Sequence, residues 1–372
     1  MPDFSAEDYR FMARTLSLAR RGLCTTHPNP RVGCVLTHQG RIVGEGWHRF
    51  AGEPHAEVLA LNAAGEHARG ATCYVNLEPC CYHGKMPACT EALIRAGVAR
   101  VVAATLDPNP RINGHGLLAL KQAGIPVQTG VLAEQAVALN RGFIKRMQHG
   151  LPFVTSKIAI SIDGRVALRS GAGQWITSGP ARADVQRLRA QTSAVMTGID
   201  TVLADDPLLT VRSPFRTVEF RQPVRVVLDS RLRFPGTAKM LSEPGRILVL
   251  TGNGERDKSA TGIADGAEII VCAMLGGRLD LASVLSHLGR LELNEILVEA
   301  GPTLNGALLQ AQLVDEIVIY IAPKLMGSQA LPMVRLDTIA TMAECIELSI
   351  LDTRAIGPDV RVIARVNYRH KL

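Results

Sequence analysis

The apolar positions in the first part of the chain predict helices alternating with short strands. Behind a possible Ser5 cap, Met12, Leu16 and Ala19 recur at helical spacing up to about Arg21. The expected strands are 32–36, 41–47, 74–77, 101–105 and 127–129, the first two forming a hairpin, and the expected helices are 55–64, 90–96, 117–123 and 135–149. Such alternation indicates an α/β layer.

Gly150-Leu151-Pro152 interrupts this pattern, and we place a domain boundary there, between residues 1–149 and 150–372. A new strand is expected over 153–158. The later apolar runs predict strands buried on both faces over 194–197, 224–228, 247–250, 268–271, 296–298 and 317–321. Helices are expected over 181–190, 282–288 and 304–311, and a terminal hairpin over 346–351 and 360–366. The second part is therefore a second α/β layer.

Composition narrows the class of protein. A chain of 372 residues with 47% hydrophobic and 20% charged residues suits two compact domains. Its N-terminus lacks the apolar core of a signal peptide and charges interrupt every long apolar run, so we expect a cytoplasmic protein. Eight cysteines are then thiols, metal ligands or core residues. The net charge of +7 is not concentrated in one run and suits a phosphorylated small molecule.

His55-Ala56-Glu57, Pro79-Cys80 and Cys89 form the pattern of a zinc site. One imidazole and two thiolates leave the fourth position of a tetrahedral zinc free for water, as a catalytic site requires. Bound zinc lowers the pKa of that water from about 15.7 to roughly 7. Glu57, at the start of a helix, can carry a proton from the water to a departing amine. The pattern predicts hydrolytic deamination of a nitrogen heterocycle.

Other interpretations of these residues stay open. Cys80 and Cys89 could be buried thiols near a surface histidine, or the zinc could be structural. Cys81 is a rival to Cys80 as a ligand. His55, Glu57, Cys80 and Cys89 nevertheless follow one another in the order of the deaminase pattern, and this agreement favours the catalytic site.

Longer motifs surround this pattern: Thr26-His27-Pro28-Asn29-Pro30 with Val32-Gly33, Gly52-Glu53-Pro54-His55-Ala56-Glu57, Leu77-Glu78-Pro79-Cys80 and His83-Gly84-Lys85. Through them the first half resembles the deaminase half of the bifunctional riboflavin-biosynthesis proteins, which join a diaminohydroxyphosphoribosylaminopyrimidine deaminase to a 5-amino-6-(5-phosphoribosylamino)uracil reductase. The resemblance implies a cytidine-deaminase-like, three-layer α/β/α domain. It implies one zinc ion held by His55, Cys80 and Cys89, with Glu57 as the catalytic proton carrier. It also places Asn29, His83 and Lys85 near the substrate.

In the second half, the segment from Glu299 to Gly306 runs from an apolar strand into a helix. Free N–H groups and the positive helix end can receive a phosphate there, although an ordinary strand-to-helix turn explains the segment equally well. Thr197 to Thr201 forms a similar junction. No Rossmann glycine pattern appears in this half. The Gly114-His115-Gly116 match with Ala119 lies in the deaminase half, where a loop is the better interpretation.

This half resembles the reductase half of the same proteins, through Ser161 to Arg165, Gln174 to Thr177, Arg187 to Arg189, Val202 to Pro207 and Glu299 to Leu304. The resemblance implies a dihydrofolate-reductase-like α/β domain that transfers hydride from NADPH. It assigns cofactor contacts to Ala159, Trp175, Thr201, Asp205, Ser230, Gly301, Pro302, Thr303, Leu304, Asn305 and Gly306. It assigns substrate contacts to Gly173, Arg189, Leu209, Arg212 and Glu299. The two arginines suit the substrate phosphate, because a guanidinium binds it through two parallel hydrogen bonds.

The expected substrate is a phosphorylated pyrimidine, 2,5-diamino-6-(5-phosphoribosylamino)pyrimidin-4-one, which is deaminated and then reduced at its ribosyl side chain. We expect a homo-oligomer, a dimer or a tetramer, with no nucleic-acid or membrane partner. One rival is a nucleic-acid base deaminase with a C-terminal binding domain, but the aromatic content of 4% offers few stacking platforms. The other is a non-catalytic, zinc-stabilised scaffold, which metal removal should unfold.

Overall fold

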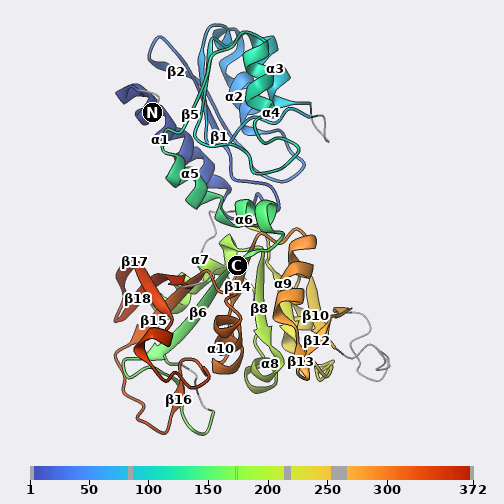
Figure 1. Cartoon of the computed structure of the whole chain (residues 1–372), viewed down its shortest axis with the longest axis vertical. Coiled ribbons are helices and arrows are strands. Elements are labelled where there is room, and N and C mark those ends of the chain that lie inside the picture. The colour runs from blue at the N-terminus through green and yellow to red at the C-terminus, as the bar shows by residue number, and fades with distance from the viewer. Residues whose placement is uncertain are drawn as a thin grey trace. The chain divides into compact units, whose positions relative to one another are not determined.

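The computed structural model describes residues 4–82, 87–171, 173, 175–212, 219–252 and 266–368. The chain divides into two compact units, Met1–Leu151 and Pro152–Leu372, each built on its own principal sheet (Figure 1). Across the described ranges, no helix combines the length and the apolar character needed to cross a bilayer.

The sheet of the first unit has the strand order β2-β1-β3-β4-β5. Its strands are β1 (Gly33–His38), β2 (Arg41–Trp47), β3 (Thr72–Val75), β4 (Arg100–Ala103) and β5 (Val127–Thr129). The first two form the expected antiparallel hairpin, and β3, β4 and β5 are parallel. All five lie at or close to the predicted strands.

Helices cover both faces of this sheet, because successive side chains of a strand point to opposite sides. Cys34 and Leu36 of β1 pack with α2 (Ala56–Ala64), α3 (Cys89–Ala96) and α4 (His115–Gln122). Val35, between them, packs with α1 (Ala6–Ala19) and α5 (Ala133–Leu139) on the other face (Figure 1). The three-layer α/β/α arrangement is confirmed. Ser5 caps α1 as expected, accepting a hydrogen bond from the backbone of Asp8. Short 3-10 turns follow α1 and α2, at Arg20–Gly22 and Gly65–Ala68.

The prediction of one closing helix over 135–149 is wrong. Two helices occupy this stretch, α5 and α6 (Arg141–His149), and they meet at Asn140. The buried side chain of Asn140 accepts a hydrogen bond from the Arg31 N–H at 2.8 Å and donates one to the Arg31 carbonyl at 3.0 Å. A contact with a distant backbone segment therefore sets the break, which the helical periodicity does not reveal.

The nine-stranded sheet of the second unit has the order β11-β10-β9-β8-β14-β6-β15-β18-β17. Its strands are β6 (Phe153–Ser161), β8 (Ala194–Gly198), β9 (Val224–Leu228), β10 (Ile247–Thr251), β11 (Glu268–Val271), β14 (Glu295–Val298), β15 (Glu316–Ala322), β17 (Glu347–Ile356) and β18 (Asp359–Asn367). The strands from β11 to β15 in this order are parallel, and the expected terminal hairpin β17–β18 closes one edge in antiparallel fashion. The prediction that 268–271 is buried on both faces is wrong, because β11 is the other edge strand and is partly exposed.

The remaining elements connect these strands. The helices are α7 (Gly179–Gln191), α8 (Ile199–Asp205), α9 (Leu281–Arg290) and α10 (Pro302–Gln310), with 3-10 turns at Lys239–Ser242 and Met342–Glu344. Four short strands form two small ribbons: β7 (Arg165–Ala167) with β16 (Leu331–Pro332), and β12 (Met274–Leu275) with β13 (Arg278–Leu279). Since β6, β14, β8 and β9 are parallel neighbours, the loops at their carboxyl ends lie along one edge of the sheet.

Candidate active sites

Three side chains from distant parts of the first unit converge on one point. The ligand atoms of His55, Cys80 and Cys89 all lie within 4.8 Å of one another. His55 Nδ1 lies 3.2 Å from Cys89 Sγ and 3.5 Å from Cys80 Sγ. A tetrahedral zinc with ordinary bond lengths separates its nitrogen and sulfur ligands by about 3.6 Å. The donor set and its spacing therefore fit a zinc ion.

Helix starts position two of these ligands. His55 is the N-cap of α2, and Cys89 is the first residue of α3. The Cys89 N–H also donates a hydrogen bond to Cys80 Sγ at 3.4 Å. The positive helix ends and these donors stabilise negative sulfur. Hydrogen bonds from Cys89 and His55 accordingly lower the pKa of the Cys80 thiol, so a thiolate is ready for a metal.

Glu57 lies beside the ligands without being one of them. It is in the first turn of α2 and only 3% exposed. Burial raises the pKa of its carboxyl, while the charge of His55 opposes that rise and Cys89 reaches it by a hydrogen bond. Among the described residues the metal-binding group has three protein members, whereas structural zinc sites use four. This arrangement leaves one position of a tetrahedral zinc open next to the buried carboxyl of Glu57.

The alternative ligand Cys81 points elsewhere. Its thiol lies 3.9 Å from the carbonyl oxygen of Arg111, and it is not part of the three-residue group. The Gly114-His115-Gly116 segment was expected to be a loop, but it forms the start of α4. The side chain of Glu78 occupies this helix start. The Glu78 carboxylate accepts hydrogen bonds from the N–H groups of Gly114 at 2.9 Å and Leu117 at 3.1 Å. That helix end is therefore filled by the protein's own carboxylate.

A second histidine belongs to this site, and the motifs did not identify it. His48 is buried, and its ring centroid is 5.4 Å from that of His55 in an edge-to-face arrangement. Its Nε2 lies 3.0 Å from Nδ2 of Asn29, and its Nδ1 lies 3.3 Å from the Pro54 carbonyl. Asn29, expected near the substrate, is thus connected to the ligand His55 through His48. No motif marked His48, because only the fold brings its ring against that of His55.

In the second unit, several residues assigned to NADPH lie along the carboxyl edge of the sheet. Ala159 is near the end of β6, Thr201 is in the first turn of α8 after β8, and Ser230 follows β9 closely. Gly301 is the N-cap of α10 after β14, and apart from its own chain neighbours no described heavy atom lies within 4 Å of the point where a Cβ would stand. This open backbone at a helix N-terminus fits a cofactor that carries phosphate groups.

Glu299 is the centre of a buried ionic cluster at the same edge. Its carboxylate accepts hydrogen bonds from Arg189 at 2.5 and 3.1 Å and pairs with Lys157 at 3.0 Å. Burial alone would raise the pKa of Glu299, but the charges of Arg189 and Lys157 lower it to about 2. Arg189 also donates to the Thr210 carbonyl, so a substrate phosphate would have to compete with Glu299 for this guanidinium. Lys157 was not identified from the sequence.

Other assigned residues have contacts of their own. Asn305 is buried, where its side chain accepts a hydrogen bond from Ser156 and donates one to Ala300. A Cβ on Gly306 would meet the Arg335 carbonyl at 1.8 Å, so this glycine permits close packing. Asn305 and Gly306 therefore lie on the buried side of α10 and pack it against the rest of the unit.

The remaining assigned residues occupy several environments. Pro302, Thr303 and Leu304 form the outer first turn of α10, and Asp205 is the last residue of α8. Leu209 is buried with a φ of +53°, Gly173 is half-buried, and Arg212 and Trp175 are exposed. His83 and Lys85 lie outside the described residues.

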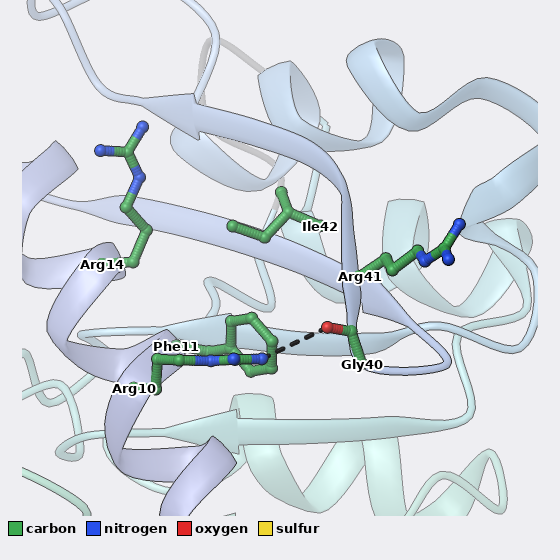
Figure 2. Close-up of a pocket in the computed structure, with 6 residues that line it drawn as sticks. All are labelled: Arg10, Phe11, Arg14, Gly40, Arg41 and Ile42. Atoms are coloured by element: carbon green, nitrogen blue, oxygen red, sulfur yellow. Dashed lines mark hydrogen bonds between the residues drawn. The ribbon is translucent and has the colours of Figure 1, made fainter.

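A pocket of about 480 Å³ lies elsewhere on the first unit, between α1 and the β1–β2 turn (Figure 2). Arg10 and Arg14 line it, but Arg10 pairs with Glu7 and Arg14 makes two 2.7 Å hydrogen bonds to Glu45. The pocket lies at the turn end of the hairpin, whereas His48 follows the other end of β2. It is therefore separate from the group of His55, Cys80 and Cys89.

Comparison with known proteins identifies the family. The zinc-binding region of cytidine and deoxycytidylate deaminases matches residues 5–105, and the RibD C-terminal domain matches residues 152–362. The riboflavin biosynthesis protein RibD of Escherichia coli is 49% identical over 364 residues, covering 95% of this chain and 98% of that protein. The chain belongs to the RibD family.

Solved RibD structures have the same fold over both units. A structure of Acinetobacter baumannii RibD aligns with a TM-score of 0.90 at 42% identity, covering 97% of this chain and 99% of that one. A Thermotoga maritima structure aligns with a TM-score of 0.86 at 32% identity and the same coverage. Its title names a diaminohydroxyphosphoribosylaminopyrimidine deaminase/5-amino-6-(5-phosphoribosylamino)uracil reductase. The predicted fold class, a deaminase domain followed by a reductase domain of the RibD family, is confirmed.

Proposed function

We propose that this chain carries out two successive steps of riboflavin biosynthesis. The unit containing residues 1–149 deaminates 2,5-diamino-6-(5-phosphoribosylamino)pyrimidin-4-one, and the unit from residue 150 onward reduces the ribosyl side chain of the product with NADPH. The observation that carries the proposal is the group of His55, Cys80 and Cys89 beside the buried Glu57, in a chain whose relatives are RibD proteins.

In the first unit, His55, Cys80 and Cys89 would hold a zinc ion, which would supply Lewis-acid activation of a water molecule. Glu57 would take a proton from water as the water oxygen bonds to the amine-bearing ring carbon, and would deliver a proton to the exocyclic amine, which leaves as ammonia when its bond to that carbon breaks. Its burial keeps bulk water from exchanging that proton. Asn29 and His48 hold the pyrimidine by hydrogen bonds next to the ligands, since their side chains meet there.

In the second unit, NADPH would supply the hydride for reduction of the ribosyl side chain. Thr201, Ser230 and the α10 N-terminus at Gly301 hold the cofactor, because they offer hydroxyl and backbone donors along one edge. Glu299, fixed by Arg189 and Lys157, orients the substrate. Arg212, which is exposed, is available for the substrate phosphate.

The assembly and its surroundings belong to the same proposal. The outer strand β17 exposes apolar side chains, with Leu348 at 41%, Ile350 at 69% and Leu351 at 51%, which supports a homo-oligomer. None of the eight cysteines forms a disulfide bond, which supports a reducing compartment such as the cytoplasm. The dispersed positive charge supports a small phosphorylated substrate rather than a nucleic acid.

The test is an assay of the purified full chain with the diaminopyrimidine substrate. Ammonia release followed by NADPH oxidation is expected. Removal of zinc should abolish ammonia release while circular dichroism keeps most of its signal, because each unit has its own core. Absence of NADPH oxidation with the deaminated substrate would contradict the second activity, and unfolding on metal removal would favour a scaffold.

A further inference from the structure

Trp175 is an exposed aromatic residue on a firmly held backbone. Its side chain is 61% exposed, yet its carbonyl accepts a hydrogen bond from Lys324 Nζ at 2.8 Å. Two residues on, the Thr177 carbonyl accepts one from Arg182 Nη1 at 2.7 Å. Next, the N–H and hydroxyl of Ser178 both donate to the carboxylate of Asp359, at 2.8 and 2.6 Å. These contacts fix the backbone on which Trp175 stands.

The same arginine covers one face of the indole. The guanidinium carbon of Arg182, on α7, lies 4.8 Å from the centre of the Trp175 ring, within the range of a cation–π contact. Because Trp175 remains 61% exposed, much of the indole stays accessible beside this arginine among the described residues. Arg182 thus holds both the ring of Trp175 and the backbone beside it.

This aromatic face lies at the carboxyl edge of the sheet. The Lys324 that binds the Trp175 carbonyl also accepts, through its own carbonyl, a hydrogen bond from the N–H of Ile162 at 2.9 Å. Ile162 follows directly after β6, which carries Ala159. Asp163 fastens the same two loops, accepting hydrogen bonds from the Gly327 N–H at 2.7 Å and the Met326 N–H at 3.1 Å. The exposed indole is therefore placed where the reductase proposal puts its reactants.

We propose that Arg182 is a positioning residue that holds the Trp175 indole as a stacking platform for a planar nitrogen heterocycle. The inference rests on the reductase function proposed above. Two reactants share this chemistry, the nicotinamide ring of NADPH and the pyrimidine ring of the deaminated substrate, and stacking on an indole suits either. Arg182 itself touches neither ring, since it occupies the other face of the tryptophan.

Trp175 can be observed directly. The chain contains two tryptophans, so a Trp47→Phe background leaves Trp175 as the single fluorophore excited at long wavelength. NADP⁺ and the deaminated pyrimidine are titrated separately into the full-length protein, and indole quenching gives a Kd for each. We expect quenching by at least one of them, which identifies the stacked heterocycle.

Arg182→Ala should raise the Kd and KM of that ligand about two- to fivefold, the effect a partly exposed cation–π contact supports, with kcat changed less. Arg182→Lys should recover most of the affinity, because it keeps the cation, whereas Arg182→Met should not. Arg290→Ala, an exposed arginine on α9, is the control and should leave both constants unchanged. Ammonia release should be the same in all variants.

Three results would overturn the platform: no quenching by either ligand, an unchanged Kd in Arg182→Ala, or equal losses in the alanine and lysine variants, which would mean a purely structural role. If the alanine variant does not fold, the lysine and methionine variants decide the question. These outcomes are separate from failure of the reductase proposal, which would appear as no NADPH oxidation by the wild-type chain with the deaminated substrate.

Discussion

Replacement of Glu57 by glutamine tests the proton carrier with little change in shape. The side chain is 3% exposed in the first turn of α2, and glutamine has nearly the same volume. An amide cannot take up and release a proton near neutral pH. A positioned acid or base contributes about 100-fold to 10,000-fold to the rate, so ammonia release should fall by that factor. This loss corresponds to a barrier increase of roughly 2.7 to 5.4 kcal/mol.

Two other properties should stay the same in Glu57→Gln. Zinc content should remain one per chain, because His55, Cys80 and Cys89 are intact. NADPH oxidation with deaminated substrate should continue at the wild-type rate, because the reductase residues belong to the other unit. Folding stability should change little, since burial already disfavours the charged carboxyl.

The assay should detect ammonia by colour formation rather than by an NADPH-coupled enzyme, because the second unit consumes the same cofactor. Elemental analysis gives the zinc content of each preparation. Glu66→Gln, an exposed glutamate just beyond α2, is the matched control and should retain full activity. Deamination within threefold of wild type by zinc-loaded Glu57→Gln would refute the role. Loss of zinc from that variant would instead mean that Glu57 supports the ligands.

Two further substitutions test buried charges. Glu299→Gln should destabilise the second unit by about 3 to 5 kcal/mol, measured by urea unfolding, because Arg189 and Lys157 would lose their buried counter-charge; a loss below about 1 kcal/mol would contradict this reasoning. In the first unit, burial raises the pKa of Asp8 but hydrogen bonds from Arg100 and Ser5 lower it, to about 2 against an ordinary 3.8. The folded-state pKa is depressed, so the stabilisation, about 2 kcal/mol, is present above pH 4 and is lost as the pH falls towards 2. Asp8→Asn should therefore be less stable than wild type at pH 7, and the difference should shrink as the pH falls from 4 towards 2; a difference that is undiminished at pH 2 would contradict this reasoning.

Local patterns predicted most of the secondary structure because they depend on neighbouring residues. The helical spacing of Met12 and Leu16 predicted α1, and the apolar run 224–228 matches β9 at both ends. Patterns failed where a distant contact decided the outcome. Asn140 interrupts a continuous helical pattern because its side chain binds the Arg31 backbone. The apolar sequence of β11 predicts a central strand, but in the described sheet no strand pairs with its outer side.

The residues of the candidate sites also fall into two groups, those that the sequence predicted and those that only the structure revealed. His55, Glu57, Cys80 and Cys89 could be recognised from the sequence because metal chemistry requires particular donor atoms, and two of these residues belong to one short helix start. His48 could not, since a histidine at the end of a strand carries no signal until the fold brings it against His55. Likewise, the family resemblance assigned Arg189 to the substrate phosphate, and only the structure shows it paired with Glu299.

The sequence by itself determined which side chains have the chemical groups to bind zinc, carry a proton or bind a phosphate. It also determined which segments form helices and strands. The tertiary structure alone decided which of these groups are already occupied by one another, as with Glu78 at the start of α4. The physical reason is that hydrogen bonds and ion pairs depend on separations of about 3 Å in space, and residues far apart along the chain reach those separations only when the fold is complete.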